Sequence, residues 1–200
     1  MLRRLRRPTA VLAALALCSA VPIAAAPAAA ADADSALAGH WTFDDGSGTT
    51  AADTAGTHPA TLNGGAGWGP GIRGGALTTD GANGFADTGA PVLDTTKSFS
   101  VSSWVKLDKT SGYQTFVSVD GAQVSNFFLQ FRDDSRRFAF TRLAGDAPTD
   151  GVVAGANFDP VAGQWYQLTG VFDAAASTLA PMLTTTCQPS SAANASAQAR

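Results

Sequence analysis

The stretch FSVSSWVKL, residues 99–107, alternates apolar and mixed side chains along its whole length. Successive side chains of a β-strand point to opposite faces of a sheet. One face of this segment therefore collects Phe99, Val101, Ser103, Val105 and Leu107, and the other collects Ser100, Ser102, Trp104 and Lys106. The period of two predicts a strand with one buried face and one mixed face.

Similar short segments recur along the chain, and glycine, aspartate, asparagine, serine or proline separates them. We expect strands at residues 40–43, 60–62, 76–78, 85–88, 113–119 and 164–172, and a hairpin with arms 127–131 and 137–142. Between Leu37 and Phe172 the sequence shows no apolar series at helical spacing. These features predict an all-β protein, an antiparallel β-sandwich.

The first 31 residues have a different character. Four arginines stand before an apolar run at 11–17, and an alanine-rich segment follows at 24–31. This order is typical of a secretory signal peptide. The apolar run is shorter than the roughly 20 residues that cross a bilayer. We therefore expect residues 1–31 to be removed on export, and a secreted, extracellular protein without a membrane span.

Charge and cysteine content narrow the possible partners. The chain has 13 Lys and Arg, 16 acidic residues and a formal net charge of −3, and loss of the four N-terminal arginines would make it more acidic. An acidic surface repels phosphate backbones, so we expect no nucleic-acid partner. Beyond the signal peptide only Cys187 remains, so a packed core rather than a disulfide must stabilise the fold.

Four blocks of the sequence resemble the LamG-like jelly-roll domain of the laminin G and concanavalin A-like lectin/glucanase superfamily. They are GHWTFDDGSGTTAADTAG (39–56), ATLNGGAGWGPGIRGGALTTDGANGFADTG (60–89), KSFSVSSWVKLD (97–108) and GQWYQLTGVFDAAASTL (163–179). The resemblance implies a concanavalin-like jelly roll of two antiparallel sheets at residues 37–183. It also implies that Trp104 lies in a central strand and that Trp165 begins another. Aromatic residues dominate sandwich cores, so we expect both tryptophans to be core anchors, and the same holds for Trp41 and Phe43.

The chain departs from this family after Leu179. The sequence shows no segments that resemble the closing strands of the family. Instead, a segment rich in threonine, serine and alanine follows Ala180-Pro181. We therefore expect a C-terminally truncated, partial domain, with residues 40–43 as an unpartnered edge strand and residues 184–200 as a disordered Ser/Ala-rich tail.

Glucanases of the same fold cleave sugars with a pair of carboxylates, and the resemblance implies glutamates at those positions. This chain contains no glutamate. The adjacent pairs Asp44-Asp45 and Asp133-Asp134 would point to opposite faces and are expected to be turn residues. His40 and His58 are the only histidines, and the sequence shows neither a Gly-x-Ser-x-Gly motif nor zinc-ligand spacing. We expect no catalytic residues and no enzyme activity.

Two kinds of binding site remain as expectations. By resemblance, calcium would bind to aspartates of rim loops, with Asp45, Asp53 and Asp80 as candidates; the alternative is that they are solvated turn residues. Trp68 lies among glycines in an expected loop, where its ring could stack on a sugar or pack at the rim of the sandwich.

The function expected from these features is a secreted, non-catalytic carbohydrate-binding or adhesion module whose partners are glycans or cell-surface polysaccharide. Two alternatives stay open. One is a structural spacer domain, and the other is a non-functional truncated remnant of a larger secreted carbohydrate-active protein.

Overall fold

The structure of the protein is a computed structural model that describes residues 37–147 and 151–187. The expected signal peptide and residues 188–200 of the expected tail lie outside this part of the chain. In the described residues the regular elements are strands, and no helix there is long and apolar enough to cross a membrane.

The described residues form thirteen strands, short in the first half of the chain and longer in the second. Their bounds are β1 Thr50–Ala51, β2 Ala60–Asn63, β3 Gly67–Pro70, β4 Gly75–Thr78, β5 Phe85–Asp87, β6 Phe99–Lys106, β7 Gln114–Asp120, β8 Ser125–Arg132, β9 Arg137–Arg142, β10 Val152–Gly155, β11 Trp165–Asp173, β12 Thr178–Leu179 and β13 Leu183–Cys187.

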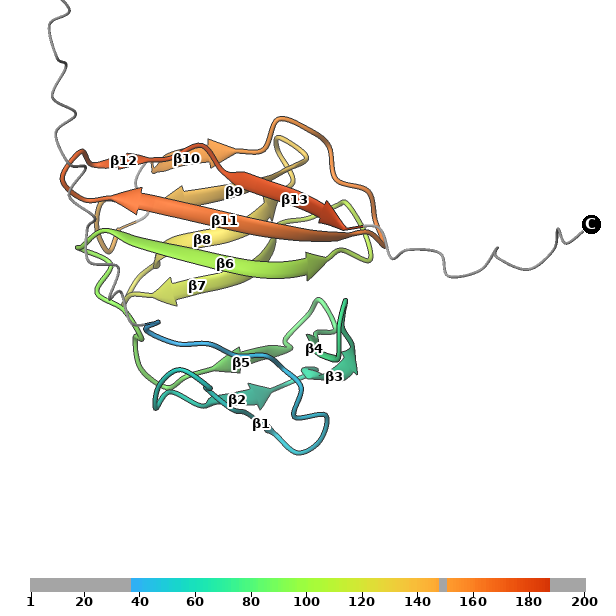
Figure 1. Ribbon diagram of the computed structural model, residues 1–200. Coiled ribbons are helices and arrows are strands. Elements are labelled where there is room, and N and C mark those ends of the chain that lie inside the picture. The colour runs from blue at the N-terminus through green and yellow to red at the C-terminus, as the bar shows by residue number, and fades with distance from the viewer. Residues whose placement is uncertain (1–36, 148–150, 188–200) are drawn as a thin grey trace, which may run out of the picture. The chain divides into compact units, whose positions relative to one another are not determined.

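Two antiparallel four-stranded sheets build the main sandwich (Figure 1). One has the strand order β10-β9-β8-β7. The other centres on β11, which pairs with β6 on one side and with β12 and β13 on the other. The strands β1, β2 and β5 form a separate three-stranded sheet, and β3 pairs with β4. The expected all-β antiparallel sandwich is confirmed.

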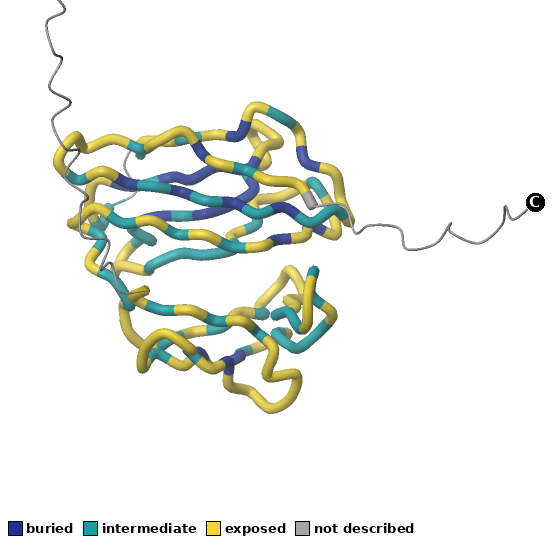
Figure 2. The backbone as a smooth tube through the Cα atoms, viewed as in Figure 1, coloured by how far each residue is buried: buried dark blue, intermediate teal, exposed yellow. Residues whose placement is uncertain are grey.

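The core lies between the two four-stranded sheets and is rich in phenylalanine. Figure 2 shows the buried residues concentrated along β8, β9 and β11. The largest fully buried side chains are Phe127, Phe131, Phe138, Phe140, Tyr166, Leu107, Leu129 and Leu168. Burial of each such side chain contributes about 1.5–3 kcal/mol. Phe138 of one sheet meets Tyr166 of the other edge to face, with ring centroids 5.0 Å apart.

The two sheets are in close contact at Gly170. A Cβ atom at this position of β11 would overlap the ring of Phe140, which projects from β9. Interiors are packed to crystal-like density, so even one added carbon at such a contact must displace its neighbours. Glycine at 170 therefore permits the spacing of the sandwich.

A smaller apolar cluster belongs to the first half of the chain. Ala51, Ala60 and Leu62 are buried there, and partly buried side chains pack against them: Trp41, Phe43, Ala66, Trp68, Leu77 and Ala86. Trp41 and Phe43 therefore have the packing role that the sequence predicted.

Several expected strands correspond to observed ones. The segments expected at 60–62, 76–78, 85–88, 99–107, 113–119 and 164–172, and both arms of the hairpin, match β2, β4, β5, β6, β7, β11, β8 and β9 to within two residues at each end. The short strands β1, β3, β10 and β12 were not expected, because their sequences lack an alternating pattern.

Three expectations about the strands are wrong. Residues 40–43 form no strand; only Trp41 makes a β-bridge, to Asp53. Residues 184–187 are not a disordered tail, because β13 pairs with β11 from Leu183 to Cys187. Trp104 and Trp165 are not core anchors, because both lie on the outer face of the sheet that contains β6 and β11; 38% of the surface of Trp104 is exposed, and Trp165 is half-buried.

Candidate functional site

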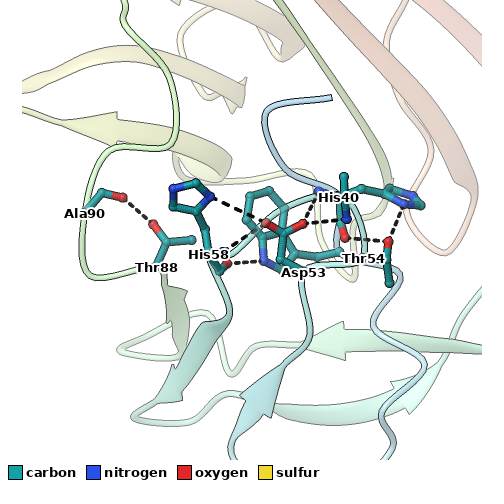
Figure 3. A network of polar contacts seen from close by, with 8 residues as sticks. His40, Asp53, Thr54, His58, Thr88 and Ala90 are labelled. Carbon is teal, nitrogen blue, oxygen red and sulfur yellow. Dashed lines mark hydrogen bonds and ion pairs between the residues drawn. The ribbon is translucent and has the colours of Figure 1, made fainter. Parts of the chain in front are cut away.

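Asp53, one of the three aspartates expected to bind calcium, accepts backbone hydrogen bonds (Figure 3). Its carboxylate accepts N–H groups of His40 at 2.8 Å, Ala55 at 3.0 Å and His58 at 3.1 Å. The amide of His40 is the largest cause that lowers the pKa of Asp53 to about 2, with smaller contributions from the other amides, against a partial opposing effect of desolvation. The hydrogen bonds of Asp53 therefore connect the loop 53–58 to the backbone at His40.

Asp45 and Asp80 have comparable local roles. The carboxylate of Asp45 accepts the amide N–H of Ala52 at 3.2 Å. Asp80 accepts three successive amides of its own turn, at 2.9–3.1 Å. These hydrogen bonds, led by the one from Ala82, lower the pKa of Asp80. In the part of the chain that the structure describes, no three His, Cys, Asp or Glu side chains gather into a metal-binding group. The structure does not bring the three calcium candidates together.

The two histidines lie in the same loop region, and their side chains contact other residues of these loops. Nδ1 of His40 lies 2.8 Å from Oγ1 of Thr54. The same hydroxyl also donates to the carbonyl oxygen of His40, at 3.0 Å. Nδ1 of His58 lies 3.6 Å from the carboxylate of Asp53. Both contacts stabilise loops.

Trp68, the expected sugar-stacking residue, lies in β3 and not in a loop. Its indole N–H donates to the carbonyl oxygen of Gly48 at 2.8 Å, and its half-buried ring packs against the small apolar cluster. The rim-packing alternative describes this geometry. A glycan could reach only the part of the ring that the cluster leaves open.

A different site lies on the outer face of the β7–β10 sheet. A shallow pocket of about 460 Å³ opens there, lined by Arg132, Asp134, Ser135, Ala139, Val153 and Gly155. Antiparallel partners share a face, and Ala139 faces Gln130 and Gly155 in the register. The neighbouring positions Phe138 and Phe140 point into the core. The pocket therefore occupies the opposite surface, with small residues forming its floor.

The polar wall of this pocket is a fixed pair of opposite charges. The guanidinium of Arg132 donates through Nε to one oxygen of Asp134 at 3.0 Å and through a second nitrogen to the other oxygen. This two-point geometry is stronger and more directional than a single contact. The same guanidinium lies 5.9 Å from the ring centroid of Tyr113, a residue that is 58% exposed. Pair and ring form a small, rigid polar and aromatic surface.

The protonation states of this group favour binding over catalysis. The hydrogen bonds from Arg132 hold the pKa of Asp134 well below its usual range, helped by Tyr113 and the amide of Ser135. The same ion pair raises the pKa of Arg132, and the hydrogen bond to Asp134 raises the pKa of Tyr113. A general acid needs a pKa near the working pH. Asp134 stays ionised at neutral pH and cannot serve as one.

The turn that carries this group was singled out in the sequence only for its aspartates. Asp133 lies in a turn, as expected, but its carboxylate accepts the amide N–H of Gly112, a residue of the segment before β7, at 2.8 Å and not an amide of its own turn. Asp134 instead binds Arg132, two residues before it. Tyr113 lies far from both in sequence, and the pairing of β7 with β8 brings it to them. The feature of the sequence that could have indicated this site is the run of one arginine and two aspartates, residues 132–134, in the connection of the expected hairpin.

Comparison with known proteins agrees with the architecture. A laminin G family model, described as the concanavalin A-like lectin/glucanases superfamily, matches residues 80–180, about half of the chain. No curated protein and no solved structure matches the chain. The matched region contains β5 to β12, and so covers the whole β7–β10 sheet and three strands of the other four-stranded sheet, β6, β11 and β12. The sandwich and the match together show that this protein belongs to the concanavalin A-like lectin/glucanases superfamily.

Proposed function

We propose that this protein is a secreted, non-catalytic module that binds glycans through the pocket on the outer face of the β7–β10 sheet. Modules of this superfamily often bind carbohydrate or mediate adhesion, and laminin G-like domains are typically non-catalytic. The observation that carries the proposal is the Arg132–Asp134 pair beside the exposed ring of Tyr113. It brings charged donors, held in place by a carboxylate, and an aromatic surface together in one place.

This chemistry suits a sugar better than an apolar ligand. A sugar presents several hydroxyl groups that both donate and accept hydrogen bonds, and its C–H face is weakly apolar. Arg132 has N–H groups beyond the two bound to Asp134 that can donate to sugar hydroxyls, and Tyr113 can cover a C–H face. A few convergent polar groups above a small apolar floor, here Ala139 and Gly155, are the usual composition of a ligand site.

The composition of the chain supports a non-catalytic role. Retaining and inverting glycosidases need one carboxyl group that is protonated at the working pH and a second that is ionised. The sequence has no glutamate, and Asp134 has a lowered pKa. A polysaccharide panel with reducing-sugar detection should show no release of product by the purified protein.

Glycan binding is tested with a glycan array, followed by calorimetry on the glycans that bind. Arg132→Gln and Asp134→Asn should each lower the affinity about tenfold or more, because hydrogen bonds to charged groups contribute about 1.5–3 kcal/mol. The matched control is Lys97→Gln, which removes a cation from the exposed pair of Lys97 and Asp94. Unchanged binding by both pocket variants would refute this site.

The array also distinguishes the alternatives. A structural spacer or a non-functional remnant would bind no glycan above the level of a denatured sample. Export rests on the pattern of residues 1–31. Expression of the full chain in a secreting bacterial host should give a protein in the medium whose N-terminus lies near residue 32, as N-terminal sequencing would show. Retention of the uncleaved chain in the cell would refute export.

A further inference from the structure

A second aromatic surface lies on the other sheet of the sandwich. The register of β6, β11 and β13 places three rows of residues side by side on one face: Lys106 with Trp165, Trp104 with Gln167 and Thr185, and Ser102 with Thr169 and Leu183. We call these three rows the tryptophan face. The residues between them in sequence, such as Val105, Tyr166 and Leu168, are buried in the core. The tryptophan face is therefore the outer side of this sheet.

Two tryptophans on the solvent side of a sheet are unusual, because burial of an indole is strongly favourable. Trp104 is 38% exposed and Trp165 is half-buried. Trp104 of β6 pairs directly with Gln167 of β11, and Trp165 lies two residues before Gln167 on the same strand, so the two tryptophans are diagonal neighbours. Diagonal neighbours of this kind are roughly 7–8 Å apart, within reach of aromatic side chains. The two indoles thus form a strip that runs obliquely across β6 and β11.

The surroundings of the strip are hydroxyl and amide groups. Oγ of Ser102 lies 3.0 Å from Oγ1 of Thr169, and Gln167 and Thr185 continue across the sheet beside Trp104. Nζ of Lys106, an exposed residue, lies 5.2 Å from the ring centroid of Trp165. The three rows contain this one charged residue and no carboxylate, although the chain has 16 aspartates. A neutral or acidic ligand meets no repulsion there.

We propose that the tryptophan face binds an extended polysaccharide chain, whose sugar rings stack on Trp104 and Trp165. Gln167 and Thr185 would hydrogen-bond the hydroxyl groups at the ring edges, and Lys106 would bind ring substituents beside Trp165. A flat sheet surface fits a chain that lies along it, whereas the pocket at Arg132 fits a single unit or a chain end. This inference does not rest on the proposed function, because the two sites lie on outer faces of different sheets.

Other occupants fit the composition less well. The core of a homodimer interface is more apolar than this face, where serine, threonine, glutamine and lysine surround the two tryptophans and Leu183 is the one aliphatic residue of the three rows. A nucleic acid would need several cations, and the three rows offer only Lys106. A row of hydroxyl and amide groups beside aromatic rings matches a polyhydroxylated chain.

The test is a pull-down of the full-length protein with insoluble cellulose, chitin and cell-wall peptidoglycan, together with affinity electrophoresis in gels that contain soluble xylan or pectin. Trp104→Ala should weaken binding to the preferred polysaccharide about tenfold or more. Trp104→Phe should retain most of the binding, because the aromatic surface remains. Gln167→Ala is a second variant for the same face, and thermal unfolding verifies that each variant is folded.

The pocket variant Arg132→Gln separates the two sites. Retained polysaccharide binding by Arg132→Gln, together with its loss in Trp104→Ala, supports the tryptophan face. The proposal is overturned if no polysaccharide binds, or if Trp104→Ala and Gln167→Ala bind like the wild-type protein. Sedimentation velocity tests whether the tryptophan face is instead a homodimer interface. If the wild-type protein is a dimer and Trp104→Ala is a monomer, the face binds a second copy of the chain and the proposal is overturned.

Discussion

The guanidinium group of Arg132 binds both carboxylate oxygens of Asp134, and this pair forms the polar wall of a pocket on the outer face of the β7–β10 sheet. The two residues stand at the end of β8 and in the turn that follows it. A turn usually leaves its charged side chains to the solvent. Here the bidentate contact holds them in one orientation before any ligand arrives, which reduces the entropy lost on binding.

The lowered pKa of Asp134 predicts how glycan binding depends on pH. An aspartate with an ordinary pKa of 3.8 would become half protonated at that pH, but Arg132 keeps the carboxylate of Asp134 ionised below it. We therefore expect the affinity to stay constant from pH 7 to about pH 4. Calorimetry at several pH values measures this. An affinity that halves near pH 4 in the wild-type protein would contradict the assigned role of the pair.

Gly170 should be intolerant of any side chain. In Gly170→Ala the added Cβ would overlap the ring of Phe140, and overpacking of this kind costs about 1–3 kcal/mol of the free energy of unfolding. Urea denaturation followed by tryptophan fluorescence measures the loss. Gly145→Ala is the matched control, because no atom lies within 4 Å of a Cβ at that position. Equal midpoints for the two variants would show that the sheets are not in contact at residue 170.

Asp53 should stabilise the fold in a pH-dependent way. Its pKa is about 2 in the folded protein and 3.8 as the reference value, so the unfolded chain takes up the proton first as the pH falls. The stabilising contribution is complete above about pH 4 and is lost as the pH falls through about 2. Asp53→Asn should therefore unfold at a lower temperature than the wild-type protein at pH 6, and the difference should shrink towards pH 2.

Differential scanning calorimetry between pH 2 and pH 6 tests this expectation about Asp53. Other aspartates also have a lowered pKa, among them Asp80 and Asp146. The informative quantity is therefore the difference between wild-type protein and variant at each pH. A difference that is the same at both ends of the range would show that the ionised carboxylate does not hold the loop.

Calcium should have little effect on stability through the three candidate aspartates. Asp45, Asp53 and Asp80 each accept amides of neighbouring backbone, and the described part of the chain has no group of three such ligands. A calcium site needs about six to eight oxygens around one point. We expect the thermal midpoint to be the same in EDTA and in millimolar calcium. A calcium-dependent rise that Asp80→Asn abolishes would restore the calcium site.

Much of the strand pattern could be read from local sequence. The alternation in residues 99–107 and 164–172 predicted β6 and β11, and the polar connection 132–136 predicted the hairpin of β8 and β9. In such segments apolar and polar side chains alternate, and this alternation identifies a strand whichever sheet the strand joins. The lack of glutamate was equally visible in the sequence. β13 escaped prediction because its three threonines carry no apolar alternation, and its partner β11 supplies the pairing.

The sequence by itself determined the class of fold and the two faces of each long strand. Only the tertiary structure decided which side chains meet and which remain in the solvent. Trp104 looked like a core residue, yet β6 turns its Phe99 face inward because that face meets Phe127 and Phe140 of the other sheet. Tyr113, Arg132 and Asp134 become one site only through the pairing of β7 with β8. Contacts between distant segments depend on register and on the spacing of the sheets, and a local pattern contains neither.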